Sequence, residues 1–468
     1  MLLPPGKSAY LALFVAADLQ VVPGATWTAN NTGTHIQAHG GGITVADGRY
    51  YWVGEDKTNG SAFQNINCYS STDLVQWTFV GALLSRQGSG DLGPERVVER
   101  PKVVWNQNSG QYVLFLHIDS SNYGEAKVGI ATSSEVCGQY EYRGSFRPLG
   151  YQSRDMGVFV DEDGSGYLLT EDRENGLRID ALSADFLNVT FPTYVFSESI
   201  ESPALVKHQG VYFIFGSHLT GWDTNDNVYA TATSLSGLWS SWTNFADKGS
   251  NTYNSQTSFI LPLRANTNGG GTEALYMGDR WVPDNLMRST YIWLPLSLDA
   301  DSRTARLTNT DAFPLSRDAS SGQWTSELWP NKQTYQAETA WDGLRGNPRT
   351  VNCDNCDGGT AIGYIGGPDN GTVAIPNVRL PGGMQTLQIK YTNGDLDQRF
   401  ADVRVGNEQE GPGGRVAFLP TGSGNNPGTS VLHLQVGDSE TDGVLVGKED
   451  SGIGNMWGPD LDSIVVAQ

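Results

Sequence analysis

The sequence has little positive charge, and little charge of either sign. Lysine and arginine supply 30 of its 468 residues, against 51 aspartates and glutamates, so the formal net charge at pH 7 is -21. A protein that binds nucleic acid or an anionic membrane presents a basic surface, and this balance argues against both kinds of partner. We expect an acidic protein that is soluble in an extracellular medium.

The sequence also lacks helical periodicity of any length, and it has no long apolar run after its N-terminus. No later stretch is long and apolar enough to cross a bilayer. At the N-terminus, Lys7 precedes an apolar run from Ala9 to Ala17, which is the pattern of a cleaved secretory signal. We therefore predict that residues 1–17 are a signal peptide, that the protein is secreted, and that the folded chain begins at about residue 18.

Cysteine is scarce, and the four cysteines form an even number, which in a secreted chain predicts disulfides. Cys353 and Cys356 are close enough in sequence to bridge locally, which leaves Cys68 and Cys137 to pair with each other. No βαβ pattern surrounds Cys353, and no second Cys or His pair stands near it, so the sequence disfavours a redox motif and a zinc site. Four Asn-X-Ser/Thr sequons would be glycosylation sites in a secreted protein, at Asn30, Asn59, Asn188 and Asn370.

Glycine and aromatic residues, by contrast, are plentiful, with 57 Gly, 13 Trp and 19 Tyr, which is typical of a β-rich protein. One pattern recurs five times: a polar residue opens an apolar strand, a turn follows, and a second apolar strand carries a tyrosine. These tyrosines lie 45 to 64 residues apart, at Tyr51, Tyr112, Tyr167, Tyr212 and Tyr276. Repeats of this size, with four short strands each, predict propeller blades, because one blade cannot bury both of its faces alone.

The blade pattern ends near Leu296, and the composition then changes twice. Residues from about Asp299 to Lys332 include few apolar side chains, which indicates a connector packed along the propeller. From Tyr335 onward, short alternating runs are separated by Gly, Asn and Asp turns, the pattern of a separate β-sandwich. We predict an all-β chain: a five-bladed β-propeller at residues 18–315, a connector at 316–332, and a β-sandwich (jelly roll) at 333–468.

Three carboxylates open the repeated strands at similar positions. Glu99, Asp155 and Glu201 lie 11 to 13 residues before the tyrosine of their own copy, so in a propeller they would meet at one end of the central channel. Convergent carboxylates repel, which raises the pKa of one of them, and an acid that stays protonated near neutral pH can protonate a glycosidic oxygen. A single such acid would more simply cap a turn at the solvent edge, but three in register favour a catalytic site.

Four short motifs surround these acids and the fifth copy: Val97-Val98-Glu99-Arg100-Pro101-Lys102, Ser153-Arg154-Asp155, Glu201-Ser202-Pro203 and Tyr276-Met277-Gly278-Asp279-Arg280-Trp281. Together they resemble the exo-acting β-1,3-galactanases of glycoside hydrolase family 43, and the C-terminal part resembles a carbohydrate-binding module of family 35. The resemblance implies a five-bladed propeller that acts as a secreted, inverting galactan 1,3-β-galactosidase. Such an enzyme releases galactose from the non-reducing end of β-1,3-galactan, the backbone of arabinogalactan.

The resemblance also implies roles for the acids. Glu201 would be the general acid, Asp155 would tune its pKa and hold the sugar, and Glu99 would bind sugar hydroxyls. Inversion needs a base that activates a water on the opposite face of the sugar. Most of the family has an Asp there on the first blade, but the first copy reads Ile36-Gln37-Ala38-His39-Gly40. Either Glu99 or Gln256, which opens the fifth copy, would have to act on the water, Gln256 through its amide or as the imidic tautomer.

Further residues complete the predicted site. Loops after the inner strands can rim the channel, and the resemblance implies sugar contacts from Glu55 and Tyr123. We also expect Thr220, Trp222 and Asp279 to bind substrate. Histidines in the inner strands are more often satisfied core residues than ligands, and we expect no catalytic metal or other cofactor. In the C-terminal module the resemblance implies a structural calcium, a hard cation that prefers oxygen ligands, with Glu338 and Asp462 as candidate ligands.

Two rival functions stay open. Another family 43 specificity, that of an arabinosidase or xylosidase, would share the propeller and the three acids and differ only in its loops. A catalytically dead, sugar-binding propeller would explain the missing Asp on the first blade. In every case we expect a polysaccharide partner and a monomer.

Overall fold

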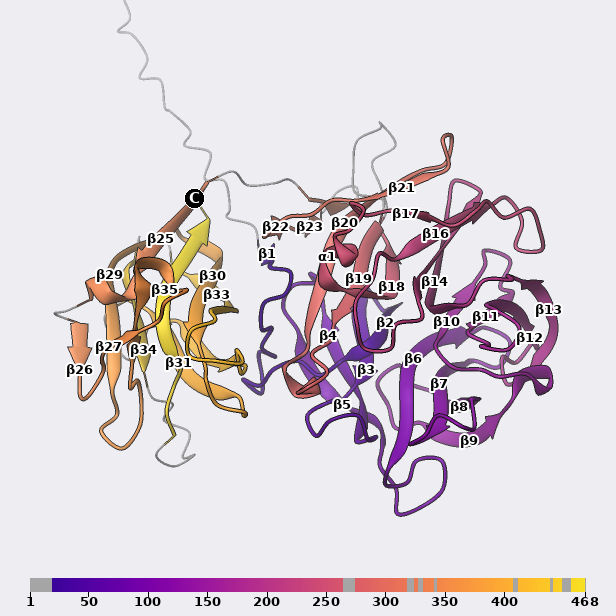
Figure 1. The fold of residues 1–468 in the computed structure, drawn as a ribbon, viewed down its shortest axis with the longest axis horizontal. Coiled ribbons are helices and arrows are strands. Elements are labelled where there is room, and N and C mark those ends of the chain that lie inside the picture. Colours follow the sequence, from indigo (N-terminus) through magenta and orange to yellow (C-terminus); the bar gives the residue numbers. More distant parts are fainter. Residues whose placement is uncertain are drawn as a thin grey trace, which may run out of the picture.

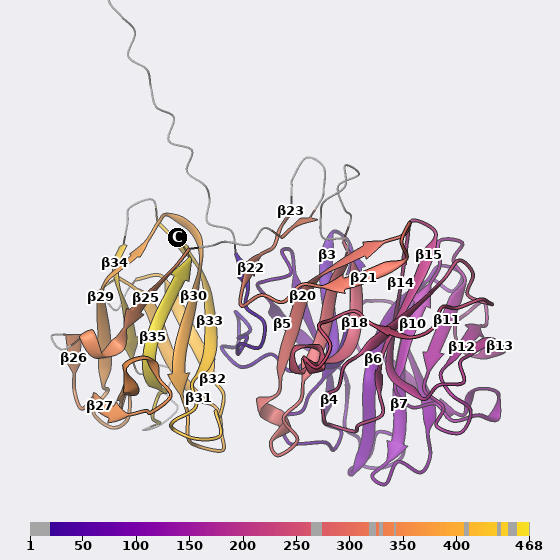
Figure 2. The same cartoon turned by 45° about the horizontal axis from the view of Figure 1, so that its top comes forward.

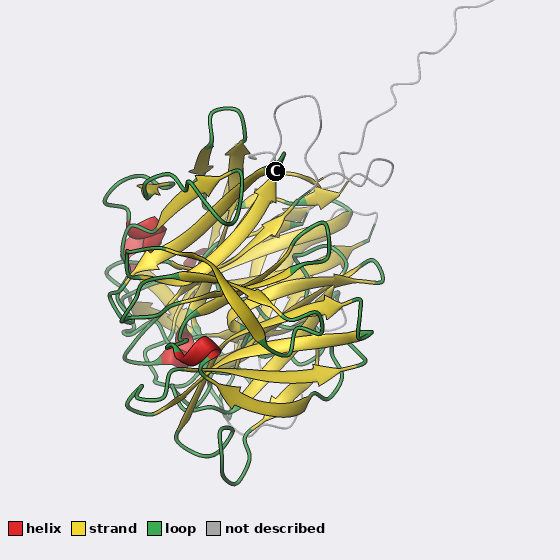
Figure 3. Ribbon diagram, turned by 90° about the vertical axis from the view of Figure 1, so that its right-hand side faces the viewer, coloured by secondary structure: helices red, strands yellow, loops and turns green. Residues whose placement is uncertain are grey.

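The computed structural model describes residues 19–263, 274–317, 324–326, 331–340, 343–406, 411–437, 441–447 and 456–467. Within these ranges β-strands make up nearly all of the regular secondary structure (Figure 3). The helical segments there are short: η1 (Pro148–Gly150), α1 (Asn251–Asn254), η2 (Leu286–Arg288), η3 (Ala337–Thr339) and η5 (Asp357–Gly359). None of the described helices is long and apolar enough to span a membrane. The predicted signal peptide at residues 1–17 lies outside the described residues.

Five four-stranded antiparallel sheets follow one another along the chain, and each pairs its strands in sequence order. Blade 1 comprises β2 (His39–Ala46), β3 (Arg49–Glu55), β4 (Asn65–Ser71) and β5 (Thr78–Ser85), and blade 2 comprises β6 (Arg96–Asn106), β7 (Gln111–Ser120), β8 (Lys127–Ser133) and β9 (Glu141–Phe146). Blade 3 comprises β10 (Met156–Val160), β11 (Gly166–Thr170), β12 (Arg178–Leu182) and β13 (Val189–Val195). Blade 4 comprises β14 (Ile200–His208), β15 (Val211–His218), β16 (Val228–Ala232) and β17 (Thr243–Asn244), and blade 5 comprises β18 (Gln256–Pro262), β19 (Ala274–Arg280), β20 (Thr290–Asp299) and β21 (Thr304–Leu307).

The blades form a ring in which the first strand of each blade is innermost (Figure 1). β2 is adjacent to β6, β6 to β10, β10 to β14, β14 to β18, and β18 again to β2. A separate buried hydrophobic cluster fills each of the five junctions between neighbouring blades. Because both faces of a blade are covered, a strand such as β15 is buried along almost its whole length and reads as a continuous apolar run. The five-repeat prediction is therefore confirmed as a five-bladed propeller.

The turns between first and second strands have the backbone that the sequence predicts. Asp47 and Gly48 take φ of 49° and 71°, and Gln209 and Gly210 take 46° and 82°. A two-residue hairpin with positive φ at both central positions matches the twist of the flanking strands, and glycine adopts it without a steric cost. These turns set the register that brings the beginnings of the inner strands to one end of the ring.

The C-terminal residues form two further sheets, which lie beside the propeller (Figures 1 and 2). The six-stranded sheet contains β25 (Lys332–Gln336), β27 (Arg349–Asn352), β28 (Thr360–Gly363), β30 (Gly383–Thr392), β33 (Gly428–Val436) and β35 (Asp460–Ala467). The five-stranded sheet contains β26 (Leu344–Arg345), β29 (Thr372–Leu380), β31 (Arg399–Val405), β32 (Gly413–Phe418) and β34 (Thr441–Gly447). One hydrophobic cluster draws buried residues from both sheets, among them Ile389 and Val403.

The N-terminal segment connects the two parts of the chain. β1 (Gln20–Val21) pairs with β22 (Phe313–Pro314), which follows the last blade. A few residues later Thr26 forms a parallel bridge with Ser430 of β33, and its N–H donates to the carbonyl of Thr429 at 2.7 Å. The same segment is therefore paired with both the propeller and the C-terminal sheets.

The structure describes part of the predicted connector and all four cysteines. Between the propeller and β25 lies a two-stranded sheet of β23 (Ser316–Arg317) and β24 (Trp324–Thr325). The buried Trp324 donates its indole N–H to the Tyr50 hydroxyl of blade 1 at 3.2 Å. Both predicted disulfides are present: one joins blades 1 and 2 through Cys68 and Cys137, and the other closes the Cys353–Cys356 loop.

Candidate active site

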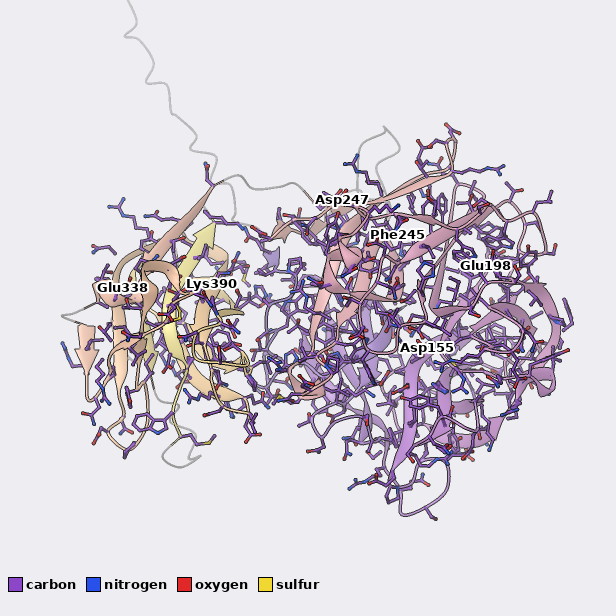
Figure 4. All side chains as sticks on the ribbon, in the orientation of Figure 1. Asp155, Glu198, Phe245, Asp247, Glu338 and Lys390 are labelled. Carbon is purple, nitrogen blue, oxygen red and sulfur yellow. A yellow bond between two sulfur atoms is a disulfide. The ribbon has the colours of Figure 1, made fainter. Side chains whose placement is uncertain are left out.

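The predicted acids lie where the inner strands begin. Glu99 is in the first half of β6, Asp155 immediately precedes β10, Glu201 is the second residue of β14, and Gln256 is the first residue of β18. Figure 4 labels Asp155 near the middle of the propeller. All four side chains are largely buried, with at most 8 % of the residue exposed. The structure therefore brings the predicted catalytic residues together at one end of the ring.

β-bulges direct these side chains into the channel. The strand register shifts immediately after Glu99 in β6 and after Glu201 in β14. The next residue has positive φ in both strands, 53° at Arg100 and 54° at Ser202. The extra residue of a bulge bends its strand and re-aims a side chain, and such bulges are frequent beside active sites. In β2 the corresponding residue is Gly40, at φ 58°, where a Cβ would collide with a carboxylate oxygen from the end of β3.

Glu201 is held as a neutral acid near neutral pH. Burial, reinforced by the nearby negative charges of Asp155 and Glu171, raises the pKa of Glu201 to about 8. One oxygen from each of these three carboxyl groups lies within 4.8 Å of the other two. A protonated carboxyl group in this position can donate its proton to a ligand oxygen, as a general acid does.

Glu99 is held in the opposite state. Although burial favours its neutral form, the Lys57 ammonium and the His117 ring lower the pKa of Glu99 to about 2. Lys57 Nζ lies 3.3 Å from Glu99 Oε1, and the Tyr123 hydroxyl donates to the same oxygen at 3.2 Å. His117 lies between Glu99 and Asp119, and these two carboxylates outweigh burial and raise its pKa to about 9. Of these two glutamates, Glu201 is therefore protonated and Glu99 ionised near neutral pH.

Arg100 connects three blades at the centre of the site. One of its nitrogens, Nη2, lies 2.7 Å from Asp155 Oδ2 and donates to Gln256 Oε1 at 2.6 Å. Its backbone N–H donates to Glu55 Oε1 at 2.8 Å. Gln256 in turn donates from Nε2 to Glu201 Oε1 at 2.9 Å. A single guanidinium therefore orders the groups around the protonated acid.

The predicted substrate-binding residues divide into two groups. Glu55, Tyr123 and Trp222 lie at the site. Glu55 forms an ion pair with Lys57, and the Tyr123 hydroxyl donates to Glu99. The Lys57 ammonium lies 5.6 Å from the centre of the Trp222 ring. Asp279 and Thr220 have their polar atoms engaged elsewhere. Both oxygens of Asp279 are engaged, one by His39 Nδ1 and the other by the N–H of Gly40, each at 3.0 Å. Thr220 is exposed and donates within its own loop to the carbonyl of Asp223.

Several charged residues of the site were not predicted from the sequence. They are Lys57, Arg100, Glu171 and Arg173, with His117 and Asp119 behind Glu99. Arg100 directly follows Glu99 in sequence. Glu171 stands at the end of the second strand of blade 3, as Glu55 does at the end of the second strand of blade 1. Their positions in the repeat could therefore have identified Arg100 and Glu171. Nothing comparable marks Lys57 or Arg173, because their roles depend on which side chains of neighbouring blades lie opposite them.

Two groups of ligand atoms have the spacing of a metal site among the described residues: Glu99 with His117 and Asp155, and Asp155 with Glu171 and Glu201. The first group lies against the Lys57 ammonium, and the second lies against the guanidinium groups of Arg100 and Arg173. These cations already balance the negative charge of the carboxylates.

The other end of the channel differs in character. A cavity of about 480 Å³ lies there, lined mainly by apolar side chains such as Val103, Phe159 and Phe259. Lys102 lies between this cavity and the acids; burial, with the nearby charge of Arg100, lowers its pKa to about 7, and its ammonium donates to the carbonyl of Gly40. Sugar binding needs several polar groups that converge on the ligand. The acidic end of the channel offers more of them, although Lys102, Asp161, Glu162 and Lys207 also line the cavity at the other end.

The chain is similar to known glycoside hydrolases. The family model for glycosyl hydrolases family 43 matches residues 39–257, which run from the first strand of blade 1 into β18. An exo-β-1,3-galactanase from Phanerochaete chrysosporium, solved with galactose, is 37 % identical over 96 % of this chain and 100 % of its own, with a TM-score of 0.64. An exo-β-1,3-galactanase from Clostridium thermocellum is 28 % identical over 94 % of this chain and 99 % of its own, with a TM-score of 0.61.

A putative exo-β-1,3-galactanase from Bifidobacterium bifidum is also 37 % identical, over 62 % of this chain and 97 % of its own, with a TM-score of 0.59. No curated protein matches the chain. The family match covers four blades and their acids, and the likeness to the Phanerochaete protein extends over nearly the whole chain. The chain belongs to glycosyl hydrolase family 43, and it is a glycoside hydrolase.

Proposed function

We propose that this protein is a secreted, inverting exo-β-1,3-galactanase that releases galactose from the non-reducing end of β-1,3-galactan. The observation that carries the proposal is the paired state of the two glutamates: Glu201 is protonated near neutral pH and Glu99 is ionised at the same end of the channel. The substrate class is supported by the likeness to structures named as exo-β-1,3-galactanases.

In the proposed reaction, Glu201 gives its proton to the glycosidic oxygen as the bond to the anomeric carbon breaks. Asp155 keeps Glu201 protonated beforehand, and Arg100 and Arg173 favour the carboxylate that forms afterwards. A water attacks the opposite face of the sugar and loses a proton to Glu99 or to Gln256, so α-galactose is the first product. Glu55, Tyr123 and Trp222 would hold the sugar beside Lys57.

The test is the release of free galactose from β-1,3-galactan, compared with arabinose from arabinan and xylose from xylan. We expect release from galactan alone, and ¹H NMR of the early reaction should show α-galactose before mutarotation. Release from arabinan or xylan instead would assign another family 43 specificity. Binding of galactan without release of any sugar would support the catalytically dead, sugar-binding alternative.

We propose that the two C-terminal sheets form a β-sandwich carbohydrate-binding module that contains a structural calcium. Two buried oxygens there, Glu338 Oε2 and Asp462 Oδ1, have no hydrogen-bond partner. Burial, with the charges of Asp357 and Glu338, raises the pKa of Asp462 to about 6. Unpartnered carboxylate oxygens that repel one another fit a hard cation, so Glu338 and Asp462 would be ligands that fix the ends of the module. Figure 4 labels Glu338 among the C-terminal strands.

A further inference from the structure

The cavity at the end of the channel away from the acids is formed by the inner strands of all five blades (Figure 1). Residues of β2, β6, β10, β14 and β18 line its volume of about 480 Å³. A cavity of about 150 Å³ already holds one benzene ring, and ligand pockets in proteins usually measure about 300–1,000 Å³. The cavity is therefore large enough for a molecule of the size of naphthalene.

The walls of this cavity are mainly apolar and include aromatic rings. Val158, Phe159 and Phe259 line it and are only half-buried, and Trp105, near the end of β6, is 44 % exposed. Apolar side chains that stay accessible in a concave surface are typical of a ligand site. Aromatic walls favour an aromatic ligand, because rings attract one another in stacked and edge-to-face arrangements.

The charged side chains on blades 3 and 4 that line the cavity are paired with one another. Lys207 Nζ lies 2.8 Å from Asp161 Oδ1 and 2.9 Å from Glu162 Oε2. The Tyr212 hydroxyl donates to the second oxygen of Asp161. Because Lys207 already has two carboxylate partners, it does not need a carboxylate from a ligand.

Lys102 on blade 2 is different, because its ammonium is buried without a carboxylate partner. Lys102 is 3 % exposed and lines the cavity on the side of the acids. A Cβ on Gly42 would lie 3.1 Å from Lys102 Cδ, so the glycine leaves room for the lysine stem. Among the described residues, Nζ makes one hydrogen bond, to the Gly40 carbonyl at 2.6 Å. An ammonium has three N–H donors, and buried donors without an acceptor are costly, so Lys102 can accommodate a further acceptor.

We propose that this cavity binds an aromatic monocarboxylate, with the ring against Phe159 and Phe259 and the carboxylate on the Lys102 ammonium. The ligand would supply the charged partner that the described part of the chain does not give Lys102, and charge-assisted hydrogen bonds are the stronger ones. Its ring would cover apolar walls that are otherwise open to water. The proposed site is separate from the acids, so this inference does not rest on the hydrolysis of galactan.

The first experiment compares three probes by calorimetry on the full-length wild-type protein. 2-Naphthoate has the ring and the charge, 2-naphthylmethanol has the ring alone, and octanoate has the charge on an aliphatic chain. We expect 2-naphthoate to bind at least about tenfold more tightly than either of the others, because only it satisfies both the walls and the ammonium. No binding of 2-naphthoate would overturn the site. Equal affinity for 2-naphthylmethanol would overturn the ion pair, and tighter binding of octanoate would overturn the aromatic class.

The second experiment places the carboxylate with a matched pair of variants. Lys102→Met removes the ammonium and keeps an unbranched apolar stem, so the affinity for 2-naphthoate should fall to that for 2-naphthylmethanol. Lys207→Met is the control, and it should keep the wild-type preference for the carboxylate. A preference that survives in Lys102→Met and is lost in Lys207→Met would place the carboxylate at Lys207 and overturn the proposal.

The third measurement needs no variant, so it decides the role of Lys102 even if Lys102→Met does not fold. Burial and the charge of Arg100 lower the pKa of Lys102 to about 7, although Glu55, Asp155 and Asp279 act to raise it. A bound carboxylate would favour the charged form and raise this pKa. Binding of 2-naphthoate should therefore take up nearly one proton at about pH 8.5 and none at about pH 5.5. Calorimetry in buffers of different ionisation enthalpy measures this uptake, and no uptake at the higher pH would overturn the ion pair.

Discussion

Glu99 on blade 2 and Glu201 on blade 4 stand at equivalent places in their strands. Each opens a bulge, and each is followed by a residue with positive φ. Their pKa values nevertheless move in opposite directions, to about 2 for Glu99 and to about 8 for Glu201. The difference comes from their neighbours: an ammonium and an imidazolium beside Glu99, two further carboxyl groups beside Glu201. The repeat therefore sets where a carboxylate is placed, and the neighbouring charged side chains set its protonation state.

The largest effect should follow removal of the proton on Glu201. Glu201→Gln keeps the shape and the contact with Gln256 but cannot donate to the leaving oxygen. We expect kcat on β-1,3-galactan to fall by about three orders of magnitude, a general-acid contribution, while calorimetry still detects galactose binding. Glu162→Gln is the matched control, because Glu162 is exposed at the other end of the channel. Wild-type turnover in Glu201→Gln would contradict the acid assignment.

Removing Glu99 tests whether the ionised glutamate takes the proton from the attacking water. Glu99→Ala takes away an ionised carboxylate without touching the protonated acid. We expect kcat to fall about 100-fold, within the range for a general base, and azide to restore part of it as α-galactosyl azide. If instead KM rises while kcat is kept, Glu99 binds sugar hydroxyls and does not act on the water.

A smaller effect is expected from Asp155→Asn, which should bring the pKa of Glu201 closer to that of Glu99. The negative charge of Asp155 helps to raise the pKa of Glu201, so Asp155→Asn should lower that pKa. Glu201 must be protonated to act, so wild-type kcat should fall as pH rises through about 8. In Asp155→Asn this alkaline limb should lie at lower pH. Ser202→Ala is the control, since it removes only the hydrogen bond of Ser202 to Asp155. A limb that does not move would mean that burial and the charge of Glu171 keep Glu201 protonated without Asp155.

The smallest expected effect is on the stability of the C-terminal sheets, which contain two carboxylates with buried oxygens, Glu338 and Asp462. Glu338 Oε2 and Asp462 Oδ1 lack the hydrogen-bond partners that the two active-site glutamates have. If calcium balances their charge, EDTA should lower the Tm of the C-terminal domain by a few degrees and CaCl₂ should restore it. Glu338→Gln should begin at the lower Tm and should not respond to EDTA. Equal Tm values with and without EDTA in the wild type would count against the calcium.

Some features of this molecule can be predicted from local sequence and others cannot. The blades and the positions of Glu99, Asp155 and Glu201 follow from a repeat of strand, turn and strand, because each blade is a local hairpin structure. Lys57 and Arg173 are different, since each acts on a carboxyl group of another blade. Such contacts depend on how blades are stacked around the ring, and one sequence without its fold contains no pattern that reports them.

The N-terminal segment forms contacts that the predicted domain boundaries do not include. A division into propeller, connector and C-terminal unit treats each as continuous in sequence. Thr26 nevertheless bonds to Thr429 and Ser430, and Tyr391 shares a hydrogen bond with the Thr26 side chain. The segment contributes to both parts, and no periodicity in a stretch this short distinguishes a strand partner from a loop.

The pairing of β1 with β22 also has a consequence for the order in which the protein is built. Gln20 is synthesised almost three hundred residues before its partner Pro314, and Thr26 waits still longer for Ser430. Blades form early because their contacts are local, whereas pairings between distant segments form late. The face of blade 1 that packs on blade 5 likewise stays uncovered until blade 5 has been synthesised. Transiently exposed apolar surface and unpaired strand edges promote aggregation, so the growing chain is open to aggregation during that interval.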